Sequence, residues 1–165
     1  MRFNLVDRLL EVEPTRVRAV KNLTLGEEYL ADHFPTFPVM PGVLMLQTLV
    51  EAGAWLLRIR DDFQHSVILL REAKNVKYGS FMEPGRQMTL TAELTEEANG
   101  TATFKGKGEA QGNVTVSAKF TLGRYNLRDR DPDLAPVDAR IVEQLKRHYL
   151  TLLKARHIEE PAKVH

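Results

Sequence analysis

The sequence lacks cysteine, which excludes disulfide bonds and thiolate metal sites. It also lacks a dominant charge, because 23 Lys and Arg residues stand against 22 Asp and Glu residues, for a formal net charge of +1 at pH 7. Such a balance gives no electrostatic reason to expect nucleic acid or an anionic membrane as a partner. No pair among the five histidines has the spacing of metal ligands, so no metal site is expected.

Apolar runs long enough to cross a membrane are also missing. Residues 1–14 carry acidic side chains early and no apolar core segment, so we expect no secretory signal and a cytoplasmic protein. The longest nearly apolar run, Val43 to Arg58, predicts a helix of about 24 Å, whereas a membrane core is about 30 Å thick. A helix that is apolar on all sides is buried, and we expect this one at the core of the fold.

Three prolines precede this helix and predict a stiff loop. Pro35, Pro38 and Pro41 each fix φ and push the preceding residue toward extended geometry. We therefore expect residues 33–40 to be non-helical. Pro41 is expected as the first helical residue, where its missing N–H costs nothing.

Most of the remaining chain predicts strands. Residues 3–12 fit either a short helix or an early strand. Alternation of apolar and polar residues predicts strands over residues 15–25, 66–70, 73–78, 87–97, 101–110 and 113–124. Asn99-Gly100 is typical of a hairpin turn. One long buried helix after the first strand, followed by an antiparallel meander, indicates an α+β fold with a single sheet wrapped around the helix.

The composition changes after Arg124, which predicts a domain at residues 1–124 and an extension at residues 125–165. Residues 125–136 read as a charged surface linker. Asp138 is a plausible N-cap for a helix over residues 139–156. The apolar residues of this segment recur at helical spacing, so one face of the helix should dock on another part of the protein.

Two features near the start of the central helix suggest chemistry. His33 stands at the mouth of the proline loop, where it can act as a general base; alternatively, it only hydrogen-bonds to loop backbone. Gly42 falls in the first helical turn, where unpaired N–H groups can polarise a thioester or amide carbonyl. The alternative for Gly42 is tight packing between the helix and a strand.

Gln47 and Glu51 are polar residues on an otherwise apolar helix. They are four residues apart and so share one face, about 6 Å apart along the axis. A buried glutamate has a raised pKa and can donate a proton near neutral pH. Alternatively, Glu51 reaches solvent or an arginine at a subunit contact.

Residues 33–52, HFPTFPVMPGVLMLQTLVEA, resemble the signature of the 3-hydroxyacyl-acyl-carrier-protein dehydratases with the hot-dog fold. That family typically has HFP, a further proline, PGVL and a catalytic acid fourteen residues after the histidine. Similar stretches are LVDRLLEVEP at residues 5–14, VRAVKNLTLGEEYLADHFP at residues 17–35 and VKYGSFMEPGRQMTL at residues 76–90. The resemblance covers residues 3–122.

This resemblance implies a sheet around the central helix, homodimers or assemblies of dimers, and an acyl tunnel at the dimer interface. His33 would remove the proton alpha to the thioester carbonyl, and the Gly42 N–H would bind that carbonyl. The family acid should lie at position 47, but this chain has Gln47 there and Glu51 one turn on. We hypothesise that Glu51 takes the acid role while Gln47 supplies hydrogen bonds. The further candidates for substrate binding are Pro41, Val43, Phe34 and Tyr78, the last at the tunnel mouth.

The function expected from the resemblance is a dehydratase (lyase) of fatty acid biosynthesis that converts 3-hydroxyacyl thioesters on acyl carrier protein to trans-2-enoyl thioesters, without a cofactor. A protein of the same fold that binds the acyl chain or the carrier without turnover is the alternative, and a hot-dog thioesterase is a third reading. A basic patch for the acidic carrier protein is one hypothesis, and ordinary solvated surface is the more common role for each candidate taken singly. Its candidates are Arg58, Arg60, Lys74, Lys77 and Arg86.

Overall fold

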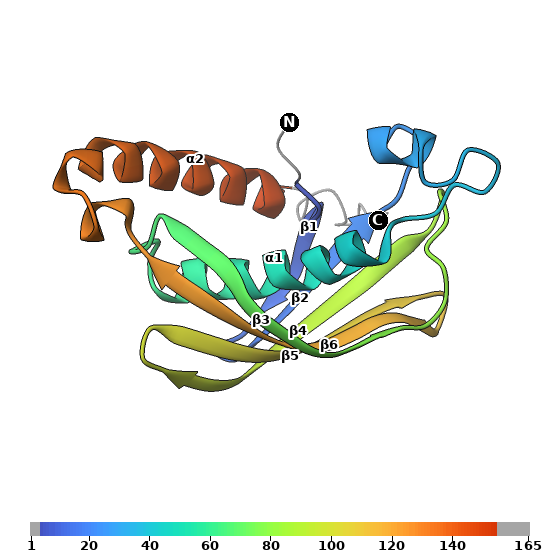
Figure 1. Ribbon diagram of the computed structural model, residues 1–165, viewed down its shortest axis with the longest axis horizontal. Coiled ribbons are helices and arrows are strands. Elements are labelled where there is room, and N and C mark those ends of the chain that lie inside the picture. The colour runs from blue at the N-terminus through green and yellow to red at the C-terminus, as the bar shows by residue number, and fades with distance from the viewer. Residues whose placement is uncertain (1–3, 155–165) are drawn as a thin grey trace, which may run out of the picture.

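The computed structural model describes residues 4–154, which form one antiparallel sheet, a long helix inside it and a second helix outside it (Figure 1). The strands follow the order β1-β2-β4-β5-β6-β3 and wrap around α1. This arrangement confirms the predicted α+β hot-dog fold. The elements are β1 (Arg8–Val12), β2 (Arg16–Asn22), η1 (Glu28–Ala31), α1 (Gly42–Arg60), β3 (Val67–Tyr78), β4 (Gln87–Ala98), β5 (Thr101–Ala110), β6 (Asn113–Tyr125), η2 (Leu127–Asp129), η3 (Pro132–Leu134) and α2 (Ala135–Lys154).

Several predicted boundaries need correction. The first segment is a strand, β1, and the two segments predicted at residues 66–70 and 73–78 are one continuous strand, β3. Only β4, β5 and β6 form the meander, because β3 pairs with β6 at the sheet edge. Helix α1 begins at Gly42, so Pro41 is its cap and not its first residue. The hairpin turn at Asn99-Gly100 is confirmed, with φ of 51° and 73° at the two residues.

The core lies between α1 and the inner face of the sheet. Phe104 on β5 and Phe120 on β6 stack with ring centroids 5.4 Å apart, and both are fully buried. Gly106 permits the close approach of the helix, since a Cβ there would lie 2.7 Å from Phe120 and 3.1 Å from Leu49 of α1. The helix predicted at residues 43–58 was too short: α1 has 19 residues, and with that length it does have the length and apolarity of a membrane span. Its position inside the sheet accounts for the apolar composition.

Helix α2 covers the C-terminal half of α1 on the side away from the sheet (Figure 1). The rings of His148 and Tyr149 lie 5.4 and 6.2 Å from Trp55 of α1, and Tyr149 lies 5.8 Å from Phe63. The predicted apolar docking face is therefore confirmed.

The predicted N-cap role of Asp138 is wrong, because α2 begins at Ala135 and places Asp138 inside the first turn. Its carboxylate is buried and accepts hydrogen bonds from the backbone N–H groups of Leu127 and Arg128, at 2.9 and 3.0 Å, and from the Ser66 hydroxyl. Asp138 thus connects α2 to η2, which contains Leu127 and Arg128, and to Ser66, which directly precedes β3. The predicted helix end at Arg156 lies outside the described residues.

Candidate active site

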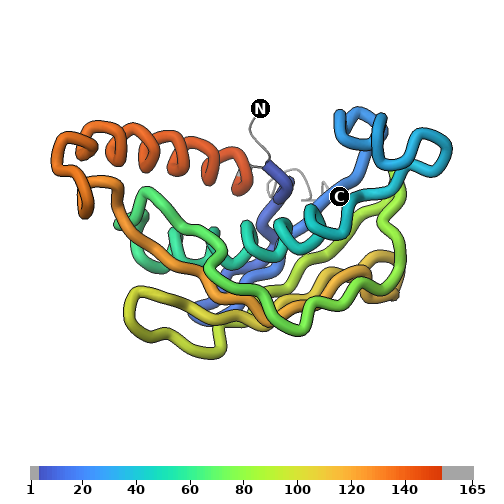
Figure 2. The backbone as a smooth tube through the Cα atoms, viewed as in Figure 1, coloured from blue at the N-terminus to red at the C-terminus, as the bar shows by residue number. Residues whose placement is uncertain are grey.

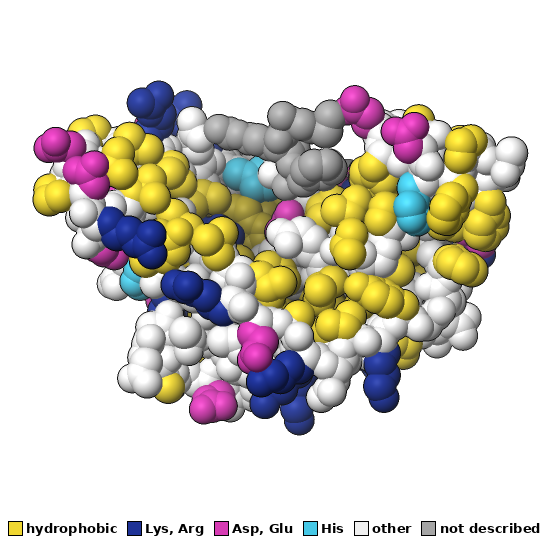
Figure 3. Space-filling model, viewed as in Figure 1, with side chains coloured by type: hydrophobic (Ala, Val, Ile, Leu, Met, Phe, Trp, Pro, Cys, Tyr) yellow, Lys and Arg dark blue, Asp and Glu magenta, His cyan; other side chains and the backbone are white. Residues whose placement is uncertain are grey.

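An apolar pocket of about 370 Å³ lies at the end of α1 that the proline loop approaches. Three segments that are distant in sequence line it: the loop before α1, the first turn of α1 and the end of β3. The pocket therefore brings together the predicted residues His33, Phe34, Gly42, Val43 and Tyr78. Figure 3 shows hydrophobic side chains gathered across this end of the molecule.

His33 is held by hydrogen bonds that determine which ring nitrogen carries the proton. Its Nδ1 lies 2.8 Å from the carbonyl oxygen of Val39. A carbonyl can only accept, so Nδ1 carries the hydrogen and the neutral ring has its lone pair on Nε2. The backbone N–H of His33 donates to the Tyr29 carbonyl at 3.2 Å, and the Val39 N–H donates to the His33 carbonyl at 3.1 Å. The backbone contact considered as an alternative therefore exists, and in the neutral ring it leaves the lone pair of Nε2 able to accept a proton.

The first turn of α1 presents unpaired backbone donors beside His33. The Pro41 carbonyl accepts hydrogen bonds from the N–H groups of Leu44 and Met45, at 2.9 and 3.1 Å. The N–H groups of Gly42 and Val43 have no backbone acceptor within residues 4–154. A Cβ at Gly42 would lie 3.0 Å from Cε1 of Tyr78, so glycine lets the Tyr78 ring pack against this turn. The close packing considered for Gly42 is therefore confirmed, and the binding of a substrate carbonyl by its N–H stays a prediction.

Glu51 does not line the His33 pocket of its own chain. Its Oε2 accepts hydrogen bonds from the backbone N–H groups of Leu5 and Val6, at 2.9 and 3.1 Å. Figure 2 shows the segment that leads into β1 passing beside the middle of α1, where this contact forms. Burial raises the pKa of the Glu51 carboxyl above its ordinary value of 4.5, although the two N–H groups, Arg58 and Lys21 act in the opposite direction. Both N–H bonds use Oε2, which leaves Oε1 able to carry a proton.

Gln47 lies one turn before Glu51 and is half-buried. Its side chain makes no hydrogen bond with any of residues 4–154, and it does not line the pocket of its own His33. One chain therefore assembles His33, the first turn of α1 and the pocket wall, whereas the two polar residues of α1 lie outside that pocket.

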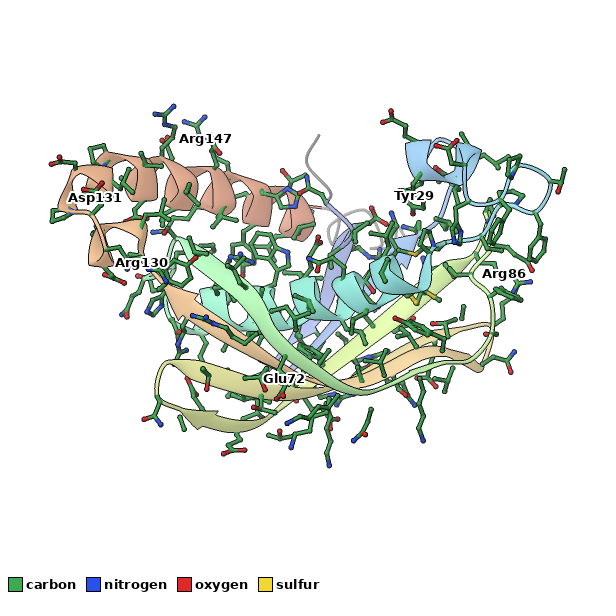
Figure 4. The ribbon with its side chains drawn as sticks, viewed as in Figure 1. Tyr29, Glu72, Arg86, Arg130, Asp131 and Arg147 are labelled. Atoms are coloured by element: carbon green, nitrogen blue, oxygen red, sulfur yellow. The ribbon has the colours of Figure 1, made fainter. Side chains whose placement is uncertain are left out.

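A buried ion pair near His33 was not predicted from the sequence. Lys21 is only 2% exposed, and its Nζ pairs with the Glu27 carboxylate and lies 3.9 Å from Asp7. This pair holds the segment between β2 and His33, which includes Tyr29 (Figure 4). The sequence did contain a signal for the burial of Lys21. Lys21 follows Val17 and Ala19 at alternate positions of β2, and these alternate positions face inward.

The basic patch considered from the sequence does not exist as one surface. Arg58 is partly buried, with its guanidinium carbon 5.3 Å from the centroid of the Trp55 ring. Arg60 pairs with Glu97 and Arg86 pairs with Glu83, each at 2.6 Å. Only Lys74 and Lys77, on β3, remain on a common exposed face.

Solved structures with this architecture confirm the hot-dog fold. The dehydratase heterocomplex ApeI:P from Xenorhabdus doucetiae superposes with a TM-score of 0.65 at 14% identity and covers 79% of this chain and 89% of that chain. The smu.793 protein from Streptococcus mutans, bound to acetyl CoA, gives a TM-score of 0.58 at 10% identity and covers 75% of this chain and 92% of that one. At these identities the likeness shows the fold alone.

Sequence comparison defines the family. The family model of the FabA-like domain matches residues 1–119. The 3-hydroxyacyl-[acyl-carrier-protein] dehydratase FabZ of Lactococcus lactis is 34% identical over 128 residues, which are 74% of this chain and 86% of that relative. The FabZ of Streptococcus suis is 32% identical over 118 residues, which are 72% of this chain and 84% of that relative. The chain belongs to the FabA-like family of dehydratases.

Proposed function

We propose that this protein is a dehydratase of fatty acid biosynthesis that converts 3-hydroxyacyl thioesters on acyl carrier protein to trans-2-enoyl thioesters. The observation that carries the proposal is the His33 ring, which donates from Nδ1 to the Val39 carbonyl and lines an apolar pocket beside the first turn of α1. The FabZ relatives, whose names state this reaction, support the same assignment.

The reaction needs a base, a donor to the carbonyl and an acid. Nε2 of His33 takes the proton alpha to the thioester carbonyl. The carbonyl oxygen accepts a hydrogen bond from the Gly42 N–H, which stabilises the developing enolate charge at the positive end of α1. The electron pair then forms the double bond as the beta hydroxyl is protonated and leaves as water. Phe34, Val43 and Tyr78 line the path of the acyl chain.

The acid in this proposal is Glu51 of the partner subunit. Burial raises the pKa of its carboxyl, which favours the protonated form that an acid requires. Oε2 is held by Leu5 and Val6, so the carboxyl is oriented, and Oε1 carries the proton to be donated. Gln47 contributes amide hydrogen bonds that orient the leaving hydroxyl.

The partner is a second copy of the chain, joined at the β3 edge and the uncovered half of α1. Within residues 4–154, strand β3 pairs only with β6, so its other edge has backbone groups that no described strand pairs. Large apolar side chains remain exposed there, with Leu69 49% and Leu70 38% accessible, and Val43 at the start of α1 is 69% accessible. A dimer that covers these groups brings α1 of one subunit toward the pocket of the other.

The second candidate function is acyl-chain binding without turnover, and Gln47 favours it because an amide cannot act as an acid. A thioesterase is a weaker third candidate. Incubation of the purified protein with a 3-hydroxyacyl-carrier substrate distinguishes them by product. Formation of the enoyl thioester that is lost in His33→Ala supports the dehydratase. Acyl binding without product supports the binding protein, and release of free acid supports the thioesterase. We also place the protein in the cytoplasm, in keeping with an apolar helix that is packed inside its own sheet.

A further inference from the structure

One face of α1, on the side away from the sheet, carries a line of four long or aromatic side chains. They follow each other at intervals of four, four and three residues, so they share one face of the helix: Gln47, Glu51, Trp55 and Arg58. Helix α2 covers the C-terminal half of α1, where the Trp55 ring contacts α2 (Figure 1). Arg58 therefore lies beside the contact between the two helices, two turns after Glu51.

Arg58 is a cation enclosed where the two helices meet. Its guanidinium carbon lies 5.3 Å from the centroid of the Trp55 ring, and the ring of His148 on α2 lies 5.4 Å from the same ring. The Nε of Arg58 is buried and has no hydrogen-bond partner within residues 4–154. An enclosed cation with an unpaired donor costs stability, whereas a neutral side chain of the same length would pack on Trp55 without that cost. Packing alone therefore does not account for an arginine at this position.

Glu51 is the carboxylate on which the charge of Arg58 acts. The two residues share one face of α1 and are about 10 Å apart along its axis. The positive charge of Arg58 lowers the pKa of the Glu51 carboxyl, against the larger effect of burial, which raises it. Burial lowers the pKa of Arg58 itself to about 10, so the guanidinium keeps its charge at neutral pH.

Lys21 on β2 is a second cation that acts on Glu51. Its charge also lowers the pKa of the Glu51 carboxyl. However, the Lys21 ammonium already pairs with the Glu27 carboxylate and lies 3.9 Å from Asp7. These carboxylates offset the field of Lys21, whereas the guanidinium of Arg58 has an aromatic ring as its neighbour. Arg58 is therefore the cation whose removal changes the charge around Glu51 most directly.

Helix α2 shields this pair of charges from solvent. The FabA-like family model ends at residue 119, so α2 lies outside the part of the chain that it matches. The helix packs through His148, Tyr149 and the buried Leu152. Burial and Arg58 lower the pKa of His148, so this ring is neutral at pH 7 and adds no charge of its own. Water and salt screen buried charges much less than exposed ones, so α2 preserves the effect of Arg58 on Glu51.

We propose that Arg58 is a positioning residue that acts through Glu51: its charge, enclosed by α2, keeps the buried carboxyl able to release its proton and then to recover it. This inference rests on the proposed function, in which Glu51 is the acid. An acid is most effective when its proton affinity matches the pH of the reaction. Burial alone would make Glu51 hold its proton too tightly, and the guanidinium stabilises the carboxylate that forms when the proton leaves.

The test replaces Arg58 with methionine, which keeps the packing of the stem on Trp55 and removes the charge. NMR of protein isotope-labelled at the glutamate carboxyls follows the titration of Glu51, and Glu51→Gln identifies its resonance. Two unit charges about 10 Å apart, at an effective dielectric constant of about 20, interact with a free energy equivalent to roughly one pH unit. The titration of Glu51 in Arg58→Met should therefore move to higher pH by roughly one pH unit.

Three further variants control for charge and fold. Arg58→Lys keeps the charge and should titrate near the wild type. Arg60→Met is the matched control on the same helix, because Arg60 pairs with Glu97 at 2.6 Å, and it should leave the titration of Glu51 unchanged. Arg58→Gln removes the same charge and carries the same expectation if Arg58→Met fails to fold.

Enzyme kinetics supply the second measurement. With a 3-hydroxyacyl-carrier substrate, one limb of the pH profile of kcat should move to higher pH together with the titration of Glu51. A loss of packing alone would lower kcat without moving this limb. The difference between Arg58→Met and wild type should persist at about 1 M salt, because the charges are enclosed.

A titration of Glu51 that is the same in wild type and in the neutral variants of Arg58 overturns the inference. So does an equal movement in Arg60→Met or in Arg58→Lys. A difference that vanishes at high salt overturns the enclosure by α2. The carboxyl titration needs no turnover. A titration that moves while the pH profile of kcat stays in place therefore supports the action of Arg58 on Glu51 and refutes Glu51 as the acid.

Discussion

Replacing Glu51 with glutamine separates its structural role from its proposed role as the acid. The amide oxygen of glutamine still accepts the N–H groups of Leu5 and Val6, which now lie 2.9 and 3.1 Å from Oε2. The loss of charge in these two bonds is offset by the easier burial of a neutral group, so we expect stability to change by about 1 kcal/mol or less. The loss of an acid costs about 10²- to 10⁴-fold in rate, which corresponds to roughly 3–5 kcal/mol of activation free energy.

The assay measures kcat at saturating 3-hydroxyacyl-carrier substrate together with the free energy of unfolding in urea. Glu51→Gln should lose activity and keep its stability. Glu51→Leu is the control for the structural role, because it leaves two donors unpaired at about 1–3 kcal/mol each and should unfold at lower urea. Adding Gln47→Glu to Glu51→Gln should restore part of the activity, since it returns a carboxyl to the family position. A kcat of Glu51→Gln within about threefold of wild type would refute Glu51 as the acid.

Three further predictions follow from individual contacts. Gly42→Ala adds a Cβ 3.0 Å from Tyr78, so it should displace the ring and lower kcat/KM by about 10- to 100-fold with little change in melting temperature. An unchanged kcat/KM would contradict this placement. Burial and nearby Arg58 lower the pKa of His148 below its ordinary 6.5, so the unfolded chain binds the proton more tightly. The stability from this packing should be present above pH 6.5 and lost as pH falls, whereas His148→Asn should lack that part of the pH dependence. Emission of the single tryptophan, Trp55, follows the unfolding. Lys119→Glu should raise the free energy of unfolding in urea by roughly 1 kcal/mol, because the cross-strand pairs of Lys119 with Lys105 and with Lys74 change from like to opposite charges. An equal decrease would show that these side chains do not face each other in this register.

The local pattern of the sequence predicts much of the fold and part of the site. The apolar run of α1, the three prolines and the Asn99-Gly100 turn each depend on neighbouring residues, and the structure confirms them. The resemblance also brings His33, Gly42 and Tyr78 together correctly, in one pocket. The catalytic roles of these residues stay predictions.

Contacts between distant parts of the chain could not be predicted from the sequence. Glu51 meets Leu5 and Val6 across 46 and 45 residues, and no local pattern encodes that approach. Asp138 has the composition of an N-cap but serves as an acceptor for a segment about ten residues earlier. The cross-strand pairs that Lys119 forms with Lys105 and Lys74 depend on strand register, which bulges shift by single residues. The division into residues 1–124 and 125–165 likewise stays a prediction.

The most direct test of the central claim compares wild type with His33→Ala on a 3-hydroxyacyl chain carried by acyl carrier protein. The ultraviolet absorbance of the conjugated enoyl thioester reports the product, and binding of the same substrate is measured in parallel. We predict that wild type forms the trans-2-enoyl thioester, and that His33→Ala binds the substrate but is slower by about 10²- to 10⁴-fold. Equal rates in the two proteins, or binding without product in wild type, would contradict the assignment of His33 as the base of a dehydratase.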